Sequence, residues 1–221
     1  MPYTALLSAL SSLPLDGYTS DQREALGTLY EYIEEPSPYA LFLLTGYAGT
    51  GKTFLLRTIA DLAHRAGLRV ELMASTGRAA KVLSASTGRP ASTIHRTIYR
   101  ASTQMQEEGG SFQLGRVSGA TPTLFIVDEA SMISGDTGEM TPFGSGNLLD
   151  DLLSYVWSAD EAKLIFVGDT AQLPPVGTPL SDALNAEVLT SRYGLHVYGM
   201  ELREVVRQKR GGILHNATQL R

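Results

Sequence analysis

Hydrophobic residues of this chain form short runs, separated by longer stretches in which they recur every three or four positions. The short runs hold four to six residues, and most are rich in Leu, Ile, Val and Phe. A run without a polar face is typical of a strand buried on both sides in a parallel sheet. The predicted strands are 41–44, 70–74, 123–127, 164–167 and 197–202.

The longer stretches predict helices, because apolar residues three or four positions apart share one helical face. Thr19 and Gln22 have the spacing of a capping box, which indicates where the first of these helices begins. The chain before Gly17 shows no clear period. Strands alternating with helices predict an α/β fold, in which helices cover both faces of a parallel sheet. The predicted helices are 19–35, 54–66, 78–86, 148–157 and 182–191.

Two segments interrupt this alternation. The segment 98–122 is polar with Glu107-Glu108-Gly109-Gly110 at its centre, which predicts a β-hairpin turning at those residues. The segment 134–146 is rich in glycine and contains Pro142, which predicts a loop. We therefore expect one domain over residues 1–221, with a small hairpin insertion.

The composition excludes several classes of protein. The chain has no cysteine, so it has no disulfide partner and no thiolate metal site, which suits a reducing cytosol and predicts a cytoplasmic protein. No apolar run approaches the length that spans a bilayer, so no membrane partner is expected.

Charge is distributed unevenly along a chain whose net charge is −5. Residues 52–116 contain ten Lys or Arg and four Asp or Glu, whereas the remainder contains eight basic and nineteen acidic residues. A local basic surface on an acidic protein is typical of a track for a nucleic-acid strand. Solvated helix faces explain the same counts, and charge alone does not decide between the two interpretations.

The segment Gly46-Tyr47-Ala48-Gly49-Thr50-Gly51-Lys52-Thr53 fits the pattern G-x-x-x-x-G-K-[ST] between a predicted strand and a predicted helix. Glycines let such a loop curl so that backbone N–H groups point at an anion, and the helix N-terminus adds its dipole. Lys52 is expected to reach the β- and γ-phosphates and Thr53 to hold Mg²⁺. The predicted nucleotide-binding residues of the loop are Gly46, Ala48, Gly49, Thr50, Gly51, Lys52 and Thr53.

Polar residues follow two further strands. Asp128 and Glu129 come directly after the third strand, where one carboxylate can hold the metal and the next can accept a proton from attacking water. Gln172 follows the fourth strand in a turn stiffened by Pro174 and Pro175, and its amide can sense the γ-phosphate. An ordinary polar turn explains Gln172 equally well. The acidic pair favours water as the phosphoryl acceptor.

These segments together resemble superfamily 1 DNA helicases, of the RecD-like and Dda-like branch. The likeness extends from about Thr19 to Arg221. The segments that carry it are the phosphate loop, Asp128-Glu129-Ala130-Ser131, Gly168-Asp169-x-x-Gln172-Leu173-Pro174-Pro175-Val176, Ala74-Ser75-Thr76-Gly77-Arg78-Ala79-Ala80-Lys81, Thr93-Ile94-His95 and Leu202-Arg203-Glu204-Val205-Val206-Arg207-Gln208.

The resemblance implies an ATP- and Mg²⁺-dependent motor domain that travels 5′ to 3′ on single-stranded DNA. It assigns adenine recognition to Gln22 and γ-phosphate contact to Arg207. It also implies that the hairpin 98–122 is the wedge that splits the duplex. Helix capping is an alternative role for Gln22 and Thr76, as is core packing for His95. The positions that match DNA-contacting residues are Thr76, Thr93 and His95, with Arg78 added on local charge.

Such helicases bind ATP between two RecA-like lobes, and the motifs of the second lobe do not occur in this sequence. We therefore expect the chain to be the first lobe, weak in hydrolysis and unable to unwind a duplex alone. Two alternatives stay open: a nucleotide-gated DNA-binding module without turnover, and a P-loop kinase of a small metabolite.

Overall fold

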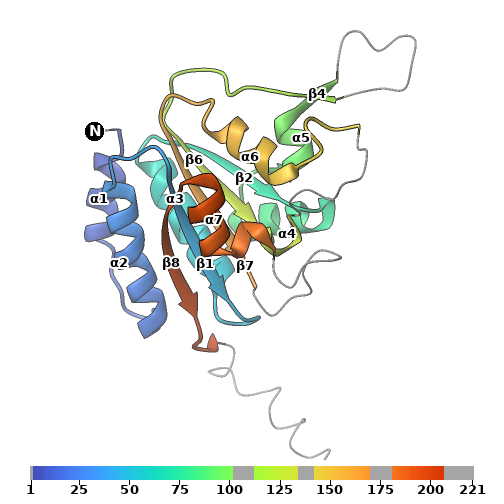
Figure 1. The fold of residues 1–221 in the computed structure, drawn as a ribbon. Coiled ribbons are helices and arrows are strands. Elements are labelled where there is room, and N and C mark those ends of the chain that lie inside the picture. The colour runs from blue at the N-terminus through green and yellow to red at the C-terminus, as the bar shows by residue number, and fades with distance from the viewer. Residues whose placement is uncertain (1, 102–111, 134–141, 170–180, 207–221) are drawn as a thin grey trace, which may run out of the picture.

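A six-stranded parallel sheet forms the centre of the protein (Figure 1). The computed structural model describes residues 2–101, 112–133, 142–169 and 181–206. The strand order is β3-β2-β6-β7-β1-β8, so β1 lies between β7 and β8. The strands are β1 (Ala40–Gly46), β2 (Arg69–Ala74), β3 (Ala91–Thr93), β6 (Thr123–Asp128), β7 (Ala162–Gly168) and β8 (His196–Leu202).

Helices cover both faces of the sheet, as the alternating pattern predicted (Figure 1). One face packs mainly against α1–α3, and the other packs mainly against α5, α6 and α7. None of the helices in the described part of the chain combines the length and the apolar character that spanning a bilayer requires. The helices are α1 (Thr4–Ser11), α2 (Ser20–Glu34), α3 (Lys52–Arg65), α4 (Gly77–Thr87), α5 (Ile94–Ile98), α6 (Leu148–Val156) and α7 (Ala186–Tyr193), with 3₁₀ turns η1 (Ala130–Met132) and η2 (Asp182–Leu184).

Strand β1 shows why these residues form a strand buried on both faces. Phe42 and Leu44 join the core under α1–α3, whereas Leu41 and Leu43 join the core on the opposite face. Successive side chains of a strand point to opposite faces, so a continuous apolar run supplies both cores. Burial of each such side chain contributes about 1.5–3 kcal/mol.

The sheet register aligns the carboxyl ends of five strands. Ala74 at the end of β2 pairs with Asp128 at the end of β6. Thr45 near the end of β1 pairs with Gly168, and Gly46 pairs with Leu202. In open α/β sheets ligands bind outside this edge of the strands. Every loop predicted to carry chemistry begins there.

All the predicted strands and helices occur, but three details were wrong or missed. The N-terminal helix α1 was not predicted, although Leu6 and Leu10 bury it against the sheet face. The predicted helix 182–191 is broken, because Asn185 accepts hydrogen bonds from the amides of Glu187 and Val188 and starts α7 anew. Strand β3 and helix α5, only three and five residues long, were also missed.

The predicted hairpin is present as an antiparallel pair of strands, β4 (Tyr99–Ala101) and β5 (Phe112–Leu114). Its predicted turn at 107–110 lies outside the described residues, as does most of the predicted loop 134–146. The pair projects from the end of α5 beside α6 (Figure 1).

Candidate functional site

The phosphate-loop segment adopts backbone angles that only glycine takes readily. Gly46, Gly49 and Gly51 have φ values of 152°, 88° and 93°. A Cβ on Gly46 would lie 2.6 Å from the carbonyl oxygen of Leu202, and one on Gly51 would lie 2.3 Å from the Gln22 amide nitrogen. Glycine therefore suits these positions for two reasons: the backbone angles of the turn, and neighbouring atoms that leave no room for a side chain at Gly46 and Gly51.

Helix α3 begins immediately after this loop, at Lys52. Its N-cap is Gly51, which has no side chain to accept the first-turn N–H groups, and its first turn holds no acidic residue. Free N–H groups and the positive end of the helix dipole favour an anion at this place. The backbone of the loop therefore fits a phosphate group.

Lys52 supplies a positive charge at the mouth of the loop. Its Nζ donates hydrogen bonds to the carbonyl oxygens of Gly46 and Tyr47, the latter at 2.9 Å. Burial lowers the pKa of Lys52, and the carboxylates of Asp169 and Asp128 oppose that shift. The structure thus brings together Lys52 and Asp128, which are 76 residues apart in the sequence.

Asp128 and Glu129 stand at the carboxyl end of β6. Burial raises the pKa of Asp128, and the charge of Glu129 raises it further. The hydrogen bond from the Glu129 amide and the charge of Lys52 lower the pKa and offset part of this shift. Asp128 Oδ1 accepts a hydrogen bond from the Glu129 amide at 2.9 Å. Glu129 has a φ of 54°, the one positive value of a non-glycine residue among the described residues. Such strain is typical of functional positions.

Gln22 has two structural partners. Its Oε1 accepts from the Thr19 amide, which completes the predicted capping box, and its Nε2 donates to the carbonyl oxygen of Thr50 at 3.2 Å. Gln22 is buried beside the phosphate loop. The structure places the side chain next to the nucleotide site, while its adenine contact stays a prediction.

The remaining predicted nucleotide residues divide into two groups. Thr53 is exposed in the first turn of α3, Ala48 is exposed in the loop, and Thr50 is buried with its hydroxyl on the Tyr47 carbonyl oxygen. Gln172 and Arg207 lie outside the described residues.

The predicted DNA-contacting residues follow two neighbouring strands. Thr76 caps α4 by accepting from the Ala79 amide, and Thr93 caps α5 by accepting from the Arg96 amide. Arg78 is exposed on α4, and the ring of His95 lies against two aromatic rings. A cavity of about 460 Å³ opens between α4, β3 and α5. Its lining includes Gly77, Lys81, Ser84, Ser92, Thr93 and Arg96.

Two residues near the site were missed as individual candidates. Asp169 is buried at the end of β7 and acts on the charge of Lys52. Its position directly after a buried strand was the available signal. Ser75 Oγ lies 3.5 Å from Glu129 Oε2, a long hydrogen bond that no sequence pattern announced.

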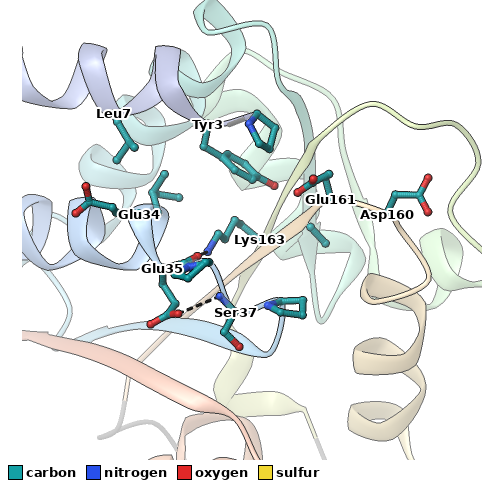
Figure 2. Close-up of a pocket in the computed structure, with 13 residues that line it drawn as sticks. Tyr3, Leu7, Glu34, Glu35, Ser37, Asp160, Glu161 and Lys163 are labelled. Atoms are coloured by element: carbon teal, nitrogen blue, oxygen red, sulfur yellow. Dashed lines mark hydrogen bonds between the residues drawn. The ribbon is translucent and has the colours of Figure 1, made fainter.

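A second cavity, of about 210 Å³, lies at the opposite end of the strands (Figure 2). Lys163 is buried there and donates to the carbonyl oxygens of Tyr32 and Glu35, at the end of α2. Glu35 in turn accepts from the Ser37 amide and the Tyr198 hydroxyl. These polar groups terminate α2 and hold the turn into β1, so this cavity is explained by the fold.

The fold and the loop define a P-loop nucleotide-binding protein: a parallel α/β sheet with a glycine-rich phosphate loop joining a strand to a helix. The chain belongs to the AAA domain family, whose sequence profile matches residues 17–221.

Two proteins that are similar in sequence indicate which kind of P-loop protein this chain resembles. The ATP-dependent RecD2 DNA helicase of Deinococcus radiodurans is 34% identical over 214 residues, which cover 93% of this chain and 27% of that protein. The ATP-dependent DNA helicase dda of Enterobacteria phage T4 is 30% identical over 213 residues, covering 95% of this chain and 44% of that protein. The chain thus spans less than half of the length of either. The resemblance to superfamily 1 helicases of this branch is confirmed.

A solved structure supports the fold. The crystal structure of Pif1 helicase from Candida albicans superimposes with a TM-score of 0.51 at 22% identity. The match covers 86% of this chain and 41% of that one. The predicted RecA-like α/β class is confirmed by this likeness and by the six-stranded parallel sheet.

Proposed function

We propose that this chain is the first motor lobe of a cytosolic DNA helicase, which hydrolyses ATP with Mg²⁺ and moves on single-stranded DNA. The observation that carries the proposal is Lys52, whose ammonium donates hydrogen bonds to the phosphate loop and interacts electrostatically with the carboxylates of Asp169 and Asp128. That is the charge arrangement expected around a metal-bound triphosphate.

Thr53 and Asp128 would hold Mg²⁺, which would neutralise charge that develops on the phosphates. Lys52 and the loop amides would bind the β- and γ-phosphates. Glu129 would accept a proton from the attacking water. The Ser75 hydroxyl would orient the Glu129 carboxylate toward that water. Gln172 and Arg207 are assigned γ-phosphate contacts from their motifs alone.

The DNA would lie across the carboxyl ends of β2 and β3. Thr76 and Thr93 stand at these ends, and Lys81 and Arg96 line the cavity beside them. Basic side chains and free helix amides bind phosphates without reading sequence. His95 would meet the strand near the hairpin, which would act as the wedge.

A hydrolysis assay with and without single-stranded DNA tests the proposal. We expect ADP and a non-cleavable ATP analogue to bind in calorimetry. Hydrolysis by the isolated chain should be slow, and DNA should stimulate it in a protein that also has the second lobe. Binding of nucleotide and DNA without stimulated hydrolysis would favour the adaptor alternative, and phosphorylated product in a metabolite screen would favour a kinase.

A further inference from the structure

Four rings meet at the base of the β4–β5 pair and form what we call the hairpin-base cluster: His95, Tyr99, Phe112 and Phe143. Phe143 is its centre. It stacks on Phe112 with ring centroids 4.8 Å apart and an interplanar angle of 24°. It meets His95 edge-on at 5.1 Å and Tyr99 at 5.3 Å. Aromatic contacts of this kind are each worth more than their buried area alone.

Backbone hydrogen bonds extend the same junction. The Phe112 amide donates to the Pro142 carbonyl oxygen at 2.7 Å, and the Gly144 amide donates to the Phe112 carbonyl oxygen at 2.9 Å. The chain around Phe143 therefore runs beside β5 as a short parallel neighbour. The hairpin has a third strand-like support at its base, so it does not stand free.

Asp151 of α6 ties this support to the main body. Its Oδ2 accepts from the Tyr99 hydroxyl at 2.6 Å and from the Ser145 amide at 3.0 Å. Asp151 is 5% exposed. A Cβ on Gly144, whose φ is 46°, would lie 2.0 Å from the same Oδ2, so the chain passes directly over the carboxylate. Burial raises the pKa of Tyr99, and Asp151 raises it further, which keeps the hydroxyl a donor.

Two observations give this carboxylate an anchoring role. Hydrogen bonds to a buried charge are stronger than neutral ones. Asp151 on α6 joins the chain just before this helix to β4, which is 52 residues away in the sequence. The flanking residues Leu149, Leu152 and Leu153 are buried in the core beneath the sheet. A load on the hairpin would thus pass through Tyr99 into the rigid α/β core.

We propose that Asp151 and Phe143 are positioning residues, which hold the hairpin at a fixed angle to α5 while strands are separated. This deepens the proposed function and rests on it. The network shares no residue with the phosphate loop, Lys52 or the Asp128-Glu129 pair. Its loss should therefore uncouple strand separation from hydrolysis rather than abolish both.

The chain offers a matched pair of variants for the test. Tyr99→Phe removes only the hydroxyl that binds Asp151. Tyr193→Phe removes an equivalent hydroxyl, which donates to the neighbouring carboxylate Asp150 at 2.6 Å and does not touch the hairpin. Asp151→Asn is the second hairpin variant, because it removes the charge and keeps the volume.

Two measurements decide the proposal. In Tyr99→Phe, hydrogen exchange at the amides of Phe112, Gly144 and Ser145 should be about tenfold faster, and Tyr193→Phe should match the wild type. In a protein that also has the second lobe, Tyr99→Phe should lower ATP-driven strand separation several-fold at unchanged DNA-stimulated hydrolysis. Unchanged exchange in both hairpin variants, or a parallel fall of hydrolysis and separation, overturns the proposal. A wild-type protein that binds no DNA counts against the proposed function instead, and exchange alone then decides the anchoring.

Discussion

Asp21 and Glu204 each accept hydrogen bonds from the other's chain segment, although they are 183 residues apart in the sequence. Asp21 Oδ2 accepts from the amides of Arg203 and Glu204 at 2.6 and 2.8 Å. Glu204 Oε2 accepts from the amide and the hydroxyl of Ser20, both at 3.0 Å. These bonds fasten the start of α2 to the end of β8, directly beside the phosphate loop.

We call these hydrogen bonds of Asp21 and Glu204 the α2–β8 clamp. Substitution Asp21→Ala tests what this clamp contributes to stability and to nucleotide binding. Two exposed amides lose a charged acceptor, so we expect the free energy of unfolding to fall by about 1 kcal/mol. ADP should bind several-fold more weakly, because Gln22 and Val206, the neighbours of the clamp, both bond to the loop. Calorimetry and urea denaturation measure the two effects. The control is Glu24→Ala, one turn along α2, and an equal loss there would contradict the clamp.

The same clamp predicts a pH dependence. Hydrogen bonds from the amides of Glu204 and Arg203 lower the pKa of Asp21. The unfolded chain therefore binds the proton at a higher pH than the folded chain does, and the stabilisation is complete above the unfolded pKa of about 4. It is lost as the pH falls through the folded value. The stability difference between wild type and Asp21→Asn should be constant near pH 7 and shrink below pH ~4.

Lys52 and Lys163 predict opposite phenotypes for the same substitution. Lys52→Ala should weaken ADP binding roughly 10- to 100-fold and leave the unfolding free energy nearly unchanged, since burial already lowers the pKa of this lysine. Lys163→Ala should keep the ADP affinity and lose about 1–3 kcal/mol of stability, because the last carbonyl groups of α2 lose their donor. Comparable losses of ADP affinity in both variants would contradict the assignment of nucleotide binding to Lys52 and of stability to Lys163.

Asp128→Asn should separate activity from stability. Hydrolysis should fall roughly 100-fold or more, since the proposed metal ligand is lost. The folded state holds the Asp128 proton to a higher pH than the unfolded state, so ionisation costs stability as the pH rises through that range. The asparagine variant has no such cost. Its melting temperature at pH 7 should equal or exceed that of the wild type, and a clear decrease would show that the carboxylate stabilises the fold.

Backbone strain at Glu129 gives a prediction that needs no ligand. A residue with a side chain at φ 54° is strained, whereas glycine is not. Glu129→Ala and Glu129→Gly both remove the carboxylate, so both should lose hydrolysis. The glycine variant should be the more stable of the two by about 1 kcal/mol in chemical denaturation. Equal stability, or a more stable alanine variant, would show that the position stores no strain.

The sequence by itself determined the sheet and the phosphate-loop segment. An apolar run such as Leu41 to Leu44 has no polar face, so it predicts burial on both sides wherever it is placed. Lys52 and Asp128 each follow such a run, and the carboxyl ends of parallel strands meet at one edge. Their proximity could therefore be predicted before any contact was known.

The tertiary structure decided everything that depends on a single contact between distant segments. Gln22 carries a capping box that its spacing announces, but its bond to the Thr50 carbonyl oxygen has no local signature. The bond of Tyr99 to Asp151 spans 52 residues in the same way. Periodicity reports only which face of an element is apolar. Which polar groups meet depends on how the elements pack, and for that the whole chain must be folded.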